Sequence, residues 1–303
     1  MQLNIQSSPL VSVIITSYNR EFCIEEAIQS VLNSSFDNYE LIIVDDSSTD
    51  NTQSIIFDYS QRYQQIRFFK NPQNLGEYEN RNLAASYASG KYIKYLDSDD
   101  VMSEDCLEIM VDKMEKNPEA AIGLLSYFDE SPYLYEGALQ PHQLYQNFYF
   151  RGNLINCGPS STIIRKDIFE LLGRYNIVPY LSDVDFIFRI SSKYPAVIFS
   201  KKFISWRRHP NQEYAYGLST GFYENKTFGY FKFYLENESN PMSPLNTKMA
   251  LRNLKNRYCR NIIKKFLSFE FKRSIKLFNI YELTLFDLVQ SFKPNTYPKT
   301  INC

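Results

Sequence analysis

The sequence predicts an α/β fold in which helices flank a mainly parallel, Rossmann-like sheet. Over the first hundred residues, short β-branched runs typical of buried strands alternate with stretches that have helical spacing. Strands separated by helices of this length form βαβ units, which build parallel sheets with helices on both faces. The 303 residues suffice for one large domain or two modest ones, so a full core can form without disulfides or metal.

The elements follow one another in a regular order. Val11–Thr16 is the first expected strand, and apolar residues at helical spacing from Ile24 to Leu32 predict the first helix. Gly90 suits the left-handed position after the third helix, and Ser103 is a suitable cap for the fourth. Further strands are expected at 41–44, 66–69 and 92–96, and further helices at 52–63, 77–88 and 103–116.

The pattern loosens after about residue 130. The stretch 133–156 is aromatic and irregular, a strand is expected at 160–164, and helices at 167–172 and 183–194. Between Lys248 and Lys276 there are ten basic side chains and one acidic one. Apolar residues recur there at helical intervals, so one or two basic amphipathic helices are expected.

Charge is distributed unevenly along the chain. The 33 basic and 34 acidic residues leave a formal net charge of −1, which argues against a nucleic-acid binder. Residues 1–130 carry 9 basic and 22 acidic side chains, whereas 131–303 carry 24 and 12, which suggests different roles for the two parts. The five cysteines form no CxxC pair and favour a reducing compartment. With no signal-peptide pattern and no apolar run of about 20 residues, a cytoplasmic protein is expected.

Two acidic turns follow buried strands. Asp97-Ser98-Asp99-Asp100 follows the fourth expected strand, and Asp45-Asp46 follows the second. Ligands bind beyond the carboxyl ends of strands in such sheets. Three crowded carboxylates repel one another unless a cation neutralises them, and a divalent ion with oxygen ligands would do so. The alternative for the first cluster is a solvated turn before the helix at Ser103. For Asp45-Asp46 it is turn and cap chemistry, which can also occur together with nucleotide binding by Asp45 or Asp46.

Several motifs, taken in order, resemble those of the family 2 glycosyltransferases, which are inverting enzymes of GT-A fold. The resemblance is strong over about 9–130 and looser over 150–212. It implies a GT-A domain at 1–212, with a nucleotide-sugar-binding half at 9–130 and an acceptor half at 131–212, followed by an aromatic and basic, largely helical region at 213–303. The motifs are Ser12–Asn19, Tyr39–Asp50, Asn74–Gly76, Arg81-Asn82 and Gly90–Asp100.

The resemblance also implies roles for single residues. Arg81 matches a residue near the diphosphate, where a planar cation suits phosphate oxygens, although a surface helix arginine is the alternative. The D-x-D motif corresponds to Asp97 and Asp99, for the ribose and for Mg²⁺ or Mn²⁺ on the diphosphate. The residues matched to nucleotide-sugar binding are Thr16, Tyr18, Asn19, Asp45, Asp46, Arg81, Asp97 and Asp99, and those matched to the metal are Asp97, Asp99, Asp100 and His209.

The segment Ser182–Phe186 resembles the Glu-Asp motif of the family, with Ser in place of the usual Glu. Asp183 then matches the general base, because the acceptor hydroxyl must lose its proton as it attacks. A helix cap or first-turn acid is the alternative role for Asp183. Trp206–Pro210 resembles the segment in which many members place a histidine near the metal. There His209 is a metal ligand or a structural histidine, and Arg207 or Arg208 offsets phosphate charge.

The expected function is inverting, metal-dependent transfer of a sugar from a nucleotide-sugar, with UDP favoured by resemblance. The expected acceptor is a hydroxyl of a glycan or lipid-linked glycan in bacterial surface-polysaccharide synthesis. The alternative is a catalytically silent, transferase-like protein that binds nucleotide or carbohydrate or scaffolds a partner. The basic stretch 248–276 is either a solvated helical face or a peripheral contact with anionic lipid at the inner face of the plasma membrane.

Overall fold

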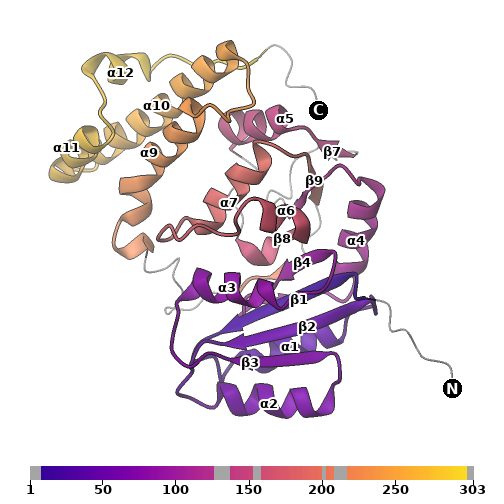
Figure 1. The fold of residues 1–303 in the computed structure, drawn as a ribbon. Coiled ribbons are helices and arrows are strands. Elements are labelled where there is room, and N and C mark those ends of the chain that lie inside the picture. The colour runs from indigo at the N-terminus through magenta and orange to yellow at the C-terminus, as the bar shows by residue number, and fades with distance from the viewer. Residues whose placement is uncertain (1–7, 126–136, 153–157, 200–202, 208–216, 299–303) are drawn as a thin grey trace. The chain divides into compact units, whose positions relative to one another are not determined.

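The computed structural model describes residues 8–125, 137–152, 158–199, 203–207 and 217–298 (Figure 1). The chain divides into two compact units. The first unit comprises Met1–Leu139, Leu154–Ile190 and Tyr194–Arg208, and the second comprises Gln140–Asn153, Ser191–Lys193 and His209–Cys303. The short segment Gln140–Asn153 therefore belongs with the C-terminal helices, although it lies between parts of the first unit in the sequence.

The first unit is built on a large central sheet, as the α/β prediction requires. Its strand order is β3-β2-β1-β4-β8-β6-β9-β7. β3, β2, β1 and β4 are parallel to one another, and so are β6 and β9, whereas β8 is antiparallel to β4 and β6, and β7 to β9. The strands are β1 (Val11–Ser17), β2 (Tyr39–Asp45), β3 (Ile66–Lys70), β4 (Tyr92–Tyr95), β6 (Ile122–Leu125), β7 (Ala138–Leu139), β8 (Thr162–Arg165) and β9 (Ala196–Phe199).

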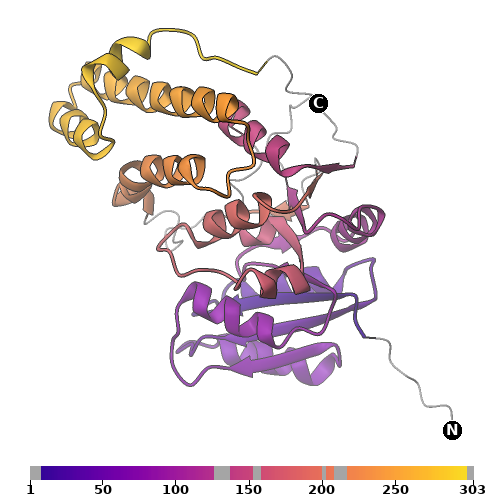
Figure 2. The ribbon, with the colours of Figure 1, turned by 45° about the horizontal axis from the view of Figure 1, so that its top comes forward.

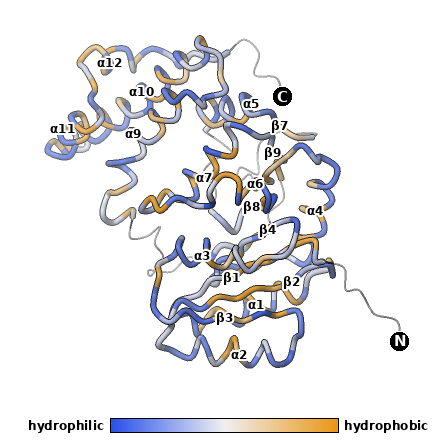
Figure 3. The backbone as a smooth tube through the Cα atoms, in the orientation of Figure 1, coloured by the Kyte–Doolittle hydropathy of each residue, from blue (hydrophilic) through white to orange (hydrophobic). Residues whose placement is uncertain are grey.

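The central strands form because their residues are apolar on both faces. Val11, Val13 and Ile15 of β1 are fully buried in one core cluster with apolar residues of the first and fourth helices, and the hydropathy tube shows β1 and β2 as the apolar centre of this unit (Figure 3).

Gly90 does not have the left-handed backbone conformation that the sequence predicts. Instead, a Cβ there would lie 2.6 Å from the Ser12 backbone nitrogen, so glycine is needed for close approach.

Helices cover the sheet and connect its strands. They are α1 (Ile24–Leu32), α2 (Thr52–Arg62), α3 (Glu77–Ser86), α4 (Cys106–Lys116), α6 (Lys166–Leu171) and α7 (Ser182–Ser191), with a 3-10 turn, η2 (Pro159–Ser161), before β8.

The fourth helix, α4, starts at Cys106 rather than Ser103, so the prediction that Ser103 caps this helix is wrong. The Ser103 hydroxyl donates 2.8 Å to the Asp105 carboxylate and leaves the helix without a side-chain cap.

The second unit is helical and rich in aromatic contacts. Its elements are α5 (Pro141–Gln146), the π-helix η1 (Asn147–Arg151), α9 (Phe222–Glu236), α10 (Pro244–Leu267), α11 (Phe271–Ile280) and α12 (Leu285–Gln290). α9 and α10 pack side by side (Figure 2). The Phe228 ring of α9 lies 5.0 Å from the rings of Tyr258 and Tyr281, and Tyr149 of η1 donates 2.7 Å to the Phe231 carbonyl.

Residues 141–151 form helix where the sequence suggested an irregular stretch. Tyr145, Phe148, Tyr149 and Phe150 are all buried, so this segment has no polar face to give it an amphipathic pattern. Among the described residues, no helix is both long enough and apolar enough to cross a bilayer.

Candidate functional site

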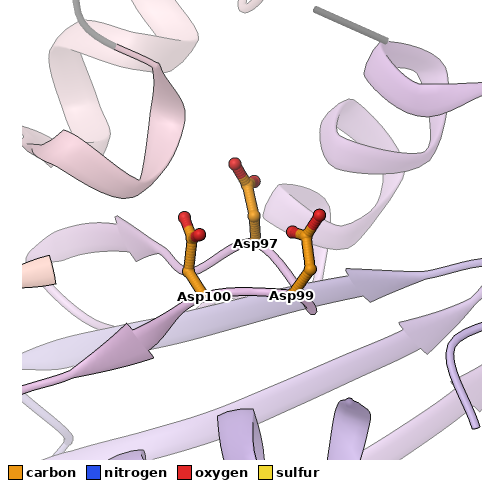
Figure 4. A group of neighbouring side chains, drawn as sticks. All are labelled: Asp97, Asp99 and Asp100. Carbon is orange, nitrogen blue, oxygen red and sulfur yellow. The ribbon is translucent and has the colours of Figure 1, made fainter. Parts of the chain in front are cut away.

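The acidic turn after β4 brings three carboxylates together. Asp97, Asp99 and Asp100 offer ligand oxygens that all lie within 4.8 Å of one another, and their side chains point to the same side of the turn (Figure 4). The Asp100 backbone N–H closes the turn by donating 2.9 Å to the Asp97 carbonyl. The turn leads into β5 (Val101–Met102), which pairs with β10 (Ile204–Ser205).

Asp100 is the most confined of the three acids. It is 1% exposed, and neither carboxylate oxygen has a hydrogen-bond partner of ordinary geometry among the described residues. Burial and the charge of Asp97 raise the pKa of Asp100 to about 8, although the Ser160 hydroxyl and the Arg207 backbone partly oppose this. A buried carboxylate of this kind fits a bound cation, so the residues present suit a divalent ion with oxygen ligands.

A buried lysine, which the sequence reasoning missed, lies at the same strand. Lys94 of β4 is 0% exposed, and its ammonium donates to the carbonyls of Tyr95, at 2.8 Å, and Ser160. Burial lowers the pKa of Lys94, whereas the nearby charges of Asp97 and Asp100 oppose that shift. The only signal in the sequence is a lysine inside an otherwise apolar strand. Its charge complements the acidic turn.

Arg81 of α3 connects this turn to a helix. It is 4% exposed, so it is no surface arginine, and its guanidinium contacts Asp97 Oδ1 at 2.6 Å and the Glu77 carboxylate. Burial alone would lower the pKa of Arg81, but the charges of Glu77 and Asp97 raise it well above its ordinary value. The Tyr78 ring centroid lies 4.9 Å from the guanidinium carbon. Arg81 is thus a permanent cation at the acidic turn, as a diphosphate would require.

Asp183 lies in the first turn of α7. The Val184 N–H donates 2.7 Å to its carboxylate, so it also acts as a first-turn acid. Burial raises the pKa of Asp183 to about 7, the charges of Glu77 and Asp97 add to this shift, and Arg81 opposes it. These effects place Asp183 within electrostatic range of Arg81 and Asp97. A carboxylate with a pKa near neutrality is well suited to accept a proton.

α3 also holds the segment that leads to Asp183. The Asn82 amide donates 2.8 Å to the Tyr175 carbonyl, and its oxygen accepts from the Tyr175 N–H at 3.0 Å. Arg174 donates to the Asn82 carbonyl at 3.0 Å. Adjacent residues of α3, Arg81 and Asn82, therefore contact the acidic turn and the backbone of Tyr175 respectively.

Arg189 of α7 also holds the segment that contains Arg174 and Tyr175. Its guanidinium donates to the carbonyls of Leu172 (2.6 Å) and Arg174 (2.5 Å) and pairs with Asp185 at 2.7 Å. Asp185 accepts a further bond from Asn176 at 2.9 Å. The sequence reasoning assigned no role to Arg189 or Asp185, although Asp185 lies in the motif that contains Asp183 and Arg189 follows on the same helix.

The second acidic turn is structured by its own carboxylates. Asp45 is fully buried and accepts bonds from the Ser48 N–H (2.8 Å), the Ser48 hydroxyl (2.5 Å) and Gln53 (2.8 Å). Asp46 accepts from the N–H groups of Leu75 and Gly76, both at 2.9 Å. The turn chemistry considered as an alternative is therefore present. Asp46 also holds the start of α3, where Gly76 has φ 90°.

The loop after β1 lies beside this turn. Asn19, at φ 52°, accepts from the Thr49 N–H at 2.9 Å, and its own N–H donates 2.8 Å to the Ser48 hydroxyl. Tyr18 is 44% exposed, and Thr16 is partly buried at the end of β1. The structure thus brings the residues matched to the nucleotide base together at one edge of the sheet, and Asn19 joins the two loops.

Arg207, one of the two arginines expected to offset phosphate charge, lies at the acidic turn. Its guanidinium donates to the Asp99 carbonyl and to the Cys23 carbonyl (3.2 Å), and it pairs with Glu26. It therefore ties the acidic turn to the start of α1. His209 and Arg208 lie outside the described residues.

Comparison with known proteins identifies the family. The model described as Glycosyl transferase family 2 matches residues 12–173. A Haemophilus influenzae protein described as an uncharacterized glycosyltransferase is 25% identical over 320 residues, which cover 95% of this chain and 96% of that protein. The Escherichia coli UDP-Glc:alpha-D-GlcNAc-diphosphoundecaprenol beta-1,3-glucosyltransferase WfgD is 41% identical over 108 residues, which cover 36% of this chain and 42% of WfgD. That match spans less than half of WfgD.

Solved structures share the fold. S. aureus TarS 1-349 in complex with UDP-GlcNAc matches with a TM-score of 0.67 at 18% identity, over 93% of this chain and 81% of TarS. The mannosyltransferase PcManGT from Pyrobaculum calidifontis, in complex with GDP-Man and Mn²⁺, matches with a TM-score of 0.59 at 14% identity, over 94% and 86%. These likenesses confirm the predicted GT-A architecture.

Proposed function

Because the chain belongs to glycosyl transferase family 2 and is a glycosyltransferase, we propose that it transfers a sugar from a UDP-sugar to an acceptor hydroxyl with inversion. The observation that carries this proposal is the arrangement around Arg81. Its guanidinium contacts Asp97, and both side chains lie within electrostatic range of Asp183. A buried guanidinium, a group of three acids and a carboxylate with a pKa near 7 thus lie close enough to interact. In this proposal they bind the diphosphate, bind a metal ion and accept a proton respectively.

The acidic turn would hold a Mg²⁺ or Mn²⁺ ion through Asp97, Asp99 and Asp100, with His209 as a further proposed ligand. Such an ion supplies Lewis-acid stabilisation of the diphosphate leaving group. Arg81 binds the diphosphate oxygens. For this, its contacts with Glu77 and Asp97 must be shared with or exchanged for phosphate, which suits a guanidinium with several donors.

Asp183 accepts the proton of the acceptor hydroxyl as the oxygen attacks the anomeric carbon. A single displacement from the face opposite the leaving group inverts the configuration at that carbon. Thr16, Tyr18, Asn19, Asp45 and Asp46 bind the nucleotide base. They lie at the ends of β1 and β2 and in the two joined loops that follow. Asp97 and Asp99 also bind the ribose. Because Asp45 already accepts three bonds inside its turn, it shapes this part of the site as well as binding.

The acceptor in this proposal is a glycan or a lipid-linked glycan of a cell-surface polysaccharide. WfgD, whose name specifies UDP-Glc and a diphosphoundecaprenol-linked acceptor, supports both the UDP donor and the lipid-linked acceptor. The minor teichoic acid biosynthesis protein GgaB of Bacillus subtilis is 36% identical over 121 residues, 39% of this chain and 12% of GgaB. An acceptor in the membrane would place the enzyme peripherally at its inner face, with the basic C-terminal helices toward the lipid.

Hydrolysis of a nucleotide-sugar panel tests this proposal. We expect UDP-sugars to be turned over with Mn²⁺ or Mg²⁺ and not in EDTA, and the Asp183→Asn variant to bind UDP normally but to lose transfer. Turnover that is equal in EDTA would contradict the metal role. Binding of donors without turnover of any of them would favour the catalytically silent alternative.

A further inference from the structure

An exposed aromatic cluster lies at the turn between α10 and α11. The ring centroids of Phe266 and Phe271 are 4.8 Å apart, and those of Phe269 and Phe271 are 5.9 Å apart. The three residues are 51%, 82% and 43% exposed, and Leu267 beside them is 73% exposed. Rings that touch one another but remain in solvent gain little from folding, because their apolar surface is still hydrated.

The backbone of this turn makes the cluster more unusual. The Glu270 N–H donates 3.0 Å to the Lys265 carbonyl, which is the hydrogen bond of a Schellman motif. The residue before Glu270 must then adopt a left-handed conformation, for which glycine is preferred. Phe269 occupies this position with φ 64°. Phe269 thus has a strained backbone conformation and buries little of its apolar side chain, so the stability of the fold does not explain a phenylalanine at this position. This suggests that the ring contacts something other than this chain.

Basic residues flank these aromatic residues in the sequence. Lys264, Lys272 and Lys276 are exposed and have no ion pair within the described part of the chain. On α11, Phe271 and Ile275 lie one turn apart, and Lys272 and Lys276 repeat the same spacing next to them. Ser274 and Leu277 form the buried side of this helix. An apolar row and a basic row therefore share the exposed side of α11.

Other basic residues of 248–276 are already engaged. Lys265 and Arg273 pair with Glu224, at 3.0 and 2.5 Å. Lys255 pairs with Asp287 at 3.3 Å, and Arg260 donates to the carbonyls of Ser291 and Lys293, both at 2.8 Å. Lys264, Lys272 and Lys276 are therefore the cations that remain available at the α10–α11 turn, whereas Lys248 and Arg257 are exposed further back along α10.

We propose that the α10–α11 turn is a membrane-docking element that inserts Phe266, Phe269 and Phe271 into the interface of an anionic bilayer. Lys264, Lys272 and Lys276 then lie at the level of the lipid phosphates, with their alkyl chains along the apolar surface. The charge of the patch selects this occupant. A second copy docked on the same patch would place these lysines against one another, whereas anionic headgroups neutralise them.

This inference deepens one part of the proposed function, the lipid-linked acceptor, but it requires neither the donor nor the metal assignment. Sedimentation of the full chain with vesicles tests it. We expect binding to phosphatidylcholine vesicles that contain phosphatidylglycerol, strong at low salt and weak at high salt, and little binding to phosphatidylcholine alone.

Phe269→Gly is the most informative variant, because glycine relieves the left-handed strain while removing the exposed ring. We expect its melting temperature to be equal to or above that of the wild type and its vesicle affinity to fall about tenfold. Lys272→Glu with Lys276→Glu should lower the affinity at least about 25-fold, since each lysine near an anionic surface contributes about a factor of five. Phe57→Ser and Lys116→Glu, at exposed sites of the first unit, are matched controls and should bind like the wild type.

Several results would overturn the proposal. Salt-insensitive or absent vesicle binding would do so, as would Phe269→Gly binding like the wild type. A concentration-dependent dimer that Phe269→Gly abolishes, without vesicle binding, would assign the patch to a second copy. Nucleotide-sugar hydrolysis by the same variants separates this test from that of the catalytic proposal: Phe269→Gly should hydrolyse normally, and Asp183→Asn should bind vesicles normally.

Discussion

The Asn82 side chain makes two hydrogen bonds with the backbone of Tyr175, a residue 93 positions further along the chain. Its neighbour Arg81 contacts Asp97 of the acidic turn at 2.6 Å. Two adjacent residues of α3 thus contact the proposed metal-binding loop, which contains Asp97, and the segment that precedes Asp183, the proposed general base. The relative position of these groups depends on α3, and four predictions follow from this arrangement and its electrostatics.

Replacing Asn82 by Ala should impair catalysis more than donor binding. Loss of two hydrogen bonds of about 1 kcal/mol each releases the Tyr175 segment, and misplacement of the base should lower kcat roughly 10- to 100-fold with little change in the KM for the donor. Steady-state kinetics with a nucleotide-sugar measure this split. Ser86→Ala, at an exposed site of the same helix, is the control. A lower melting temperature with unchanged kcat would show that Asn82 serves stability alone.

The transfer rate should fall on the acid side of neutrality. The pKa of Asp183 is about 7, so the carboxylate is protonated and unable to accept a proton at lower pH. We expect kcat to fall about tenfold per pH unit below pH 6. The small residual activity of Asp183→Asn, on the order of 10²- to 10⁴-fold lower, should lack this limb. Asp58→Asn, on the exposed side of α2, should keep the wild-type profile. A profile that is flat from pH 5 to 8 would remove Asp183 from the role of base.

The same pKa makes a prediction about folding. The Asp183 pKa is raised from 3.8 to about 7 in the fold, so its contribution to stability is present below about pH 4 and is lost as pH rises through 7. In EDTA, Asp183→Asn should therefore gain stability relative to the wild type between pH 5 and pH 8, on the order of 1–3 kcal/mol. Urea unfolding at the two pH values measures this gain. An equal difference between the two proteins at both pH values would mean that the native carboxyl titrates normally.

Divalent ions should stabilise the folded protein through the acidic turn. At a Mn²⁺ concentration about 100 times the dissociation constant, binding should add about 2.7 kcal/mol to the free energy of unfolding. Asp99→Ala should lose most of this increment, whereas Asp112→Asn, an exposed acid of α4, should keep it. Thermal unfolding with Mn²⁺ and with EDTA gives the comparison. An undiminished increment in Asp99→Ala would place the ion elsewhere.

Local patterns predicted much of the first unit. Strands β1 to β4 and helices α1 to α3 are found where β-branched runs and 3.6-residue spacing indicated them, because both signals lie within a few neighbouring residues. The π-helix at Asn147–Arg151 was missed, since its aromatic residues are buried and show no amphipathic spacing. Gly90 was assigned to a left-handed turn, but the reason for glycine there is the Ser12 backbone, which is 78 residues away in the sequence.

The amino-acid sequence by itself determined the α/β class, the order of the first elements and the motifs that indicate a glycosyltransferase. These features depend on residue types within short stretches of the chain. The parallel topology then predicts that acids after neighbouring strands lie at the same end of the sheet. Only the tertiary structure decided that Lys94 is buried at the acidic turn, that Asn82 holds Tyr175 and that Arg207 is tied to Glu26 and Asp99. Each of these depends on a contact between segments distant in sequence or on complete desolvation of a charge, and no local pattern encodes either.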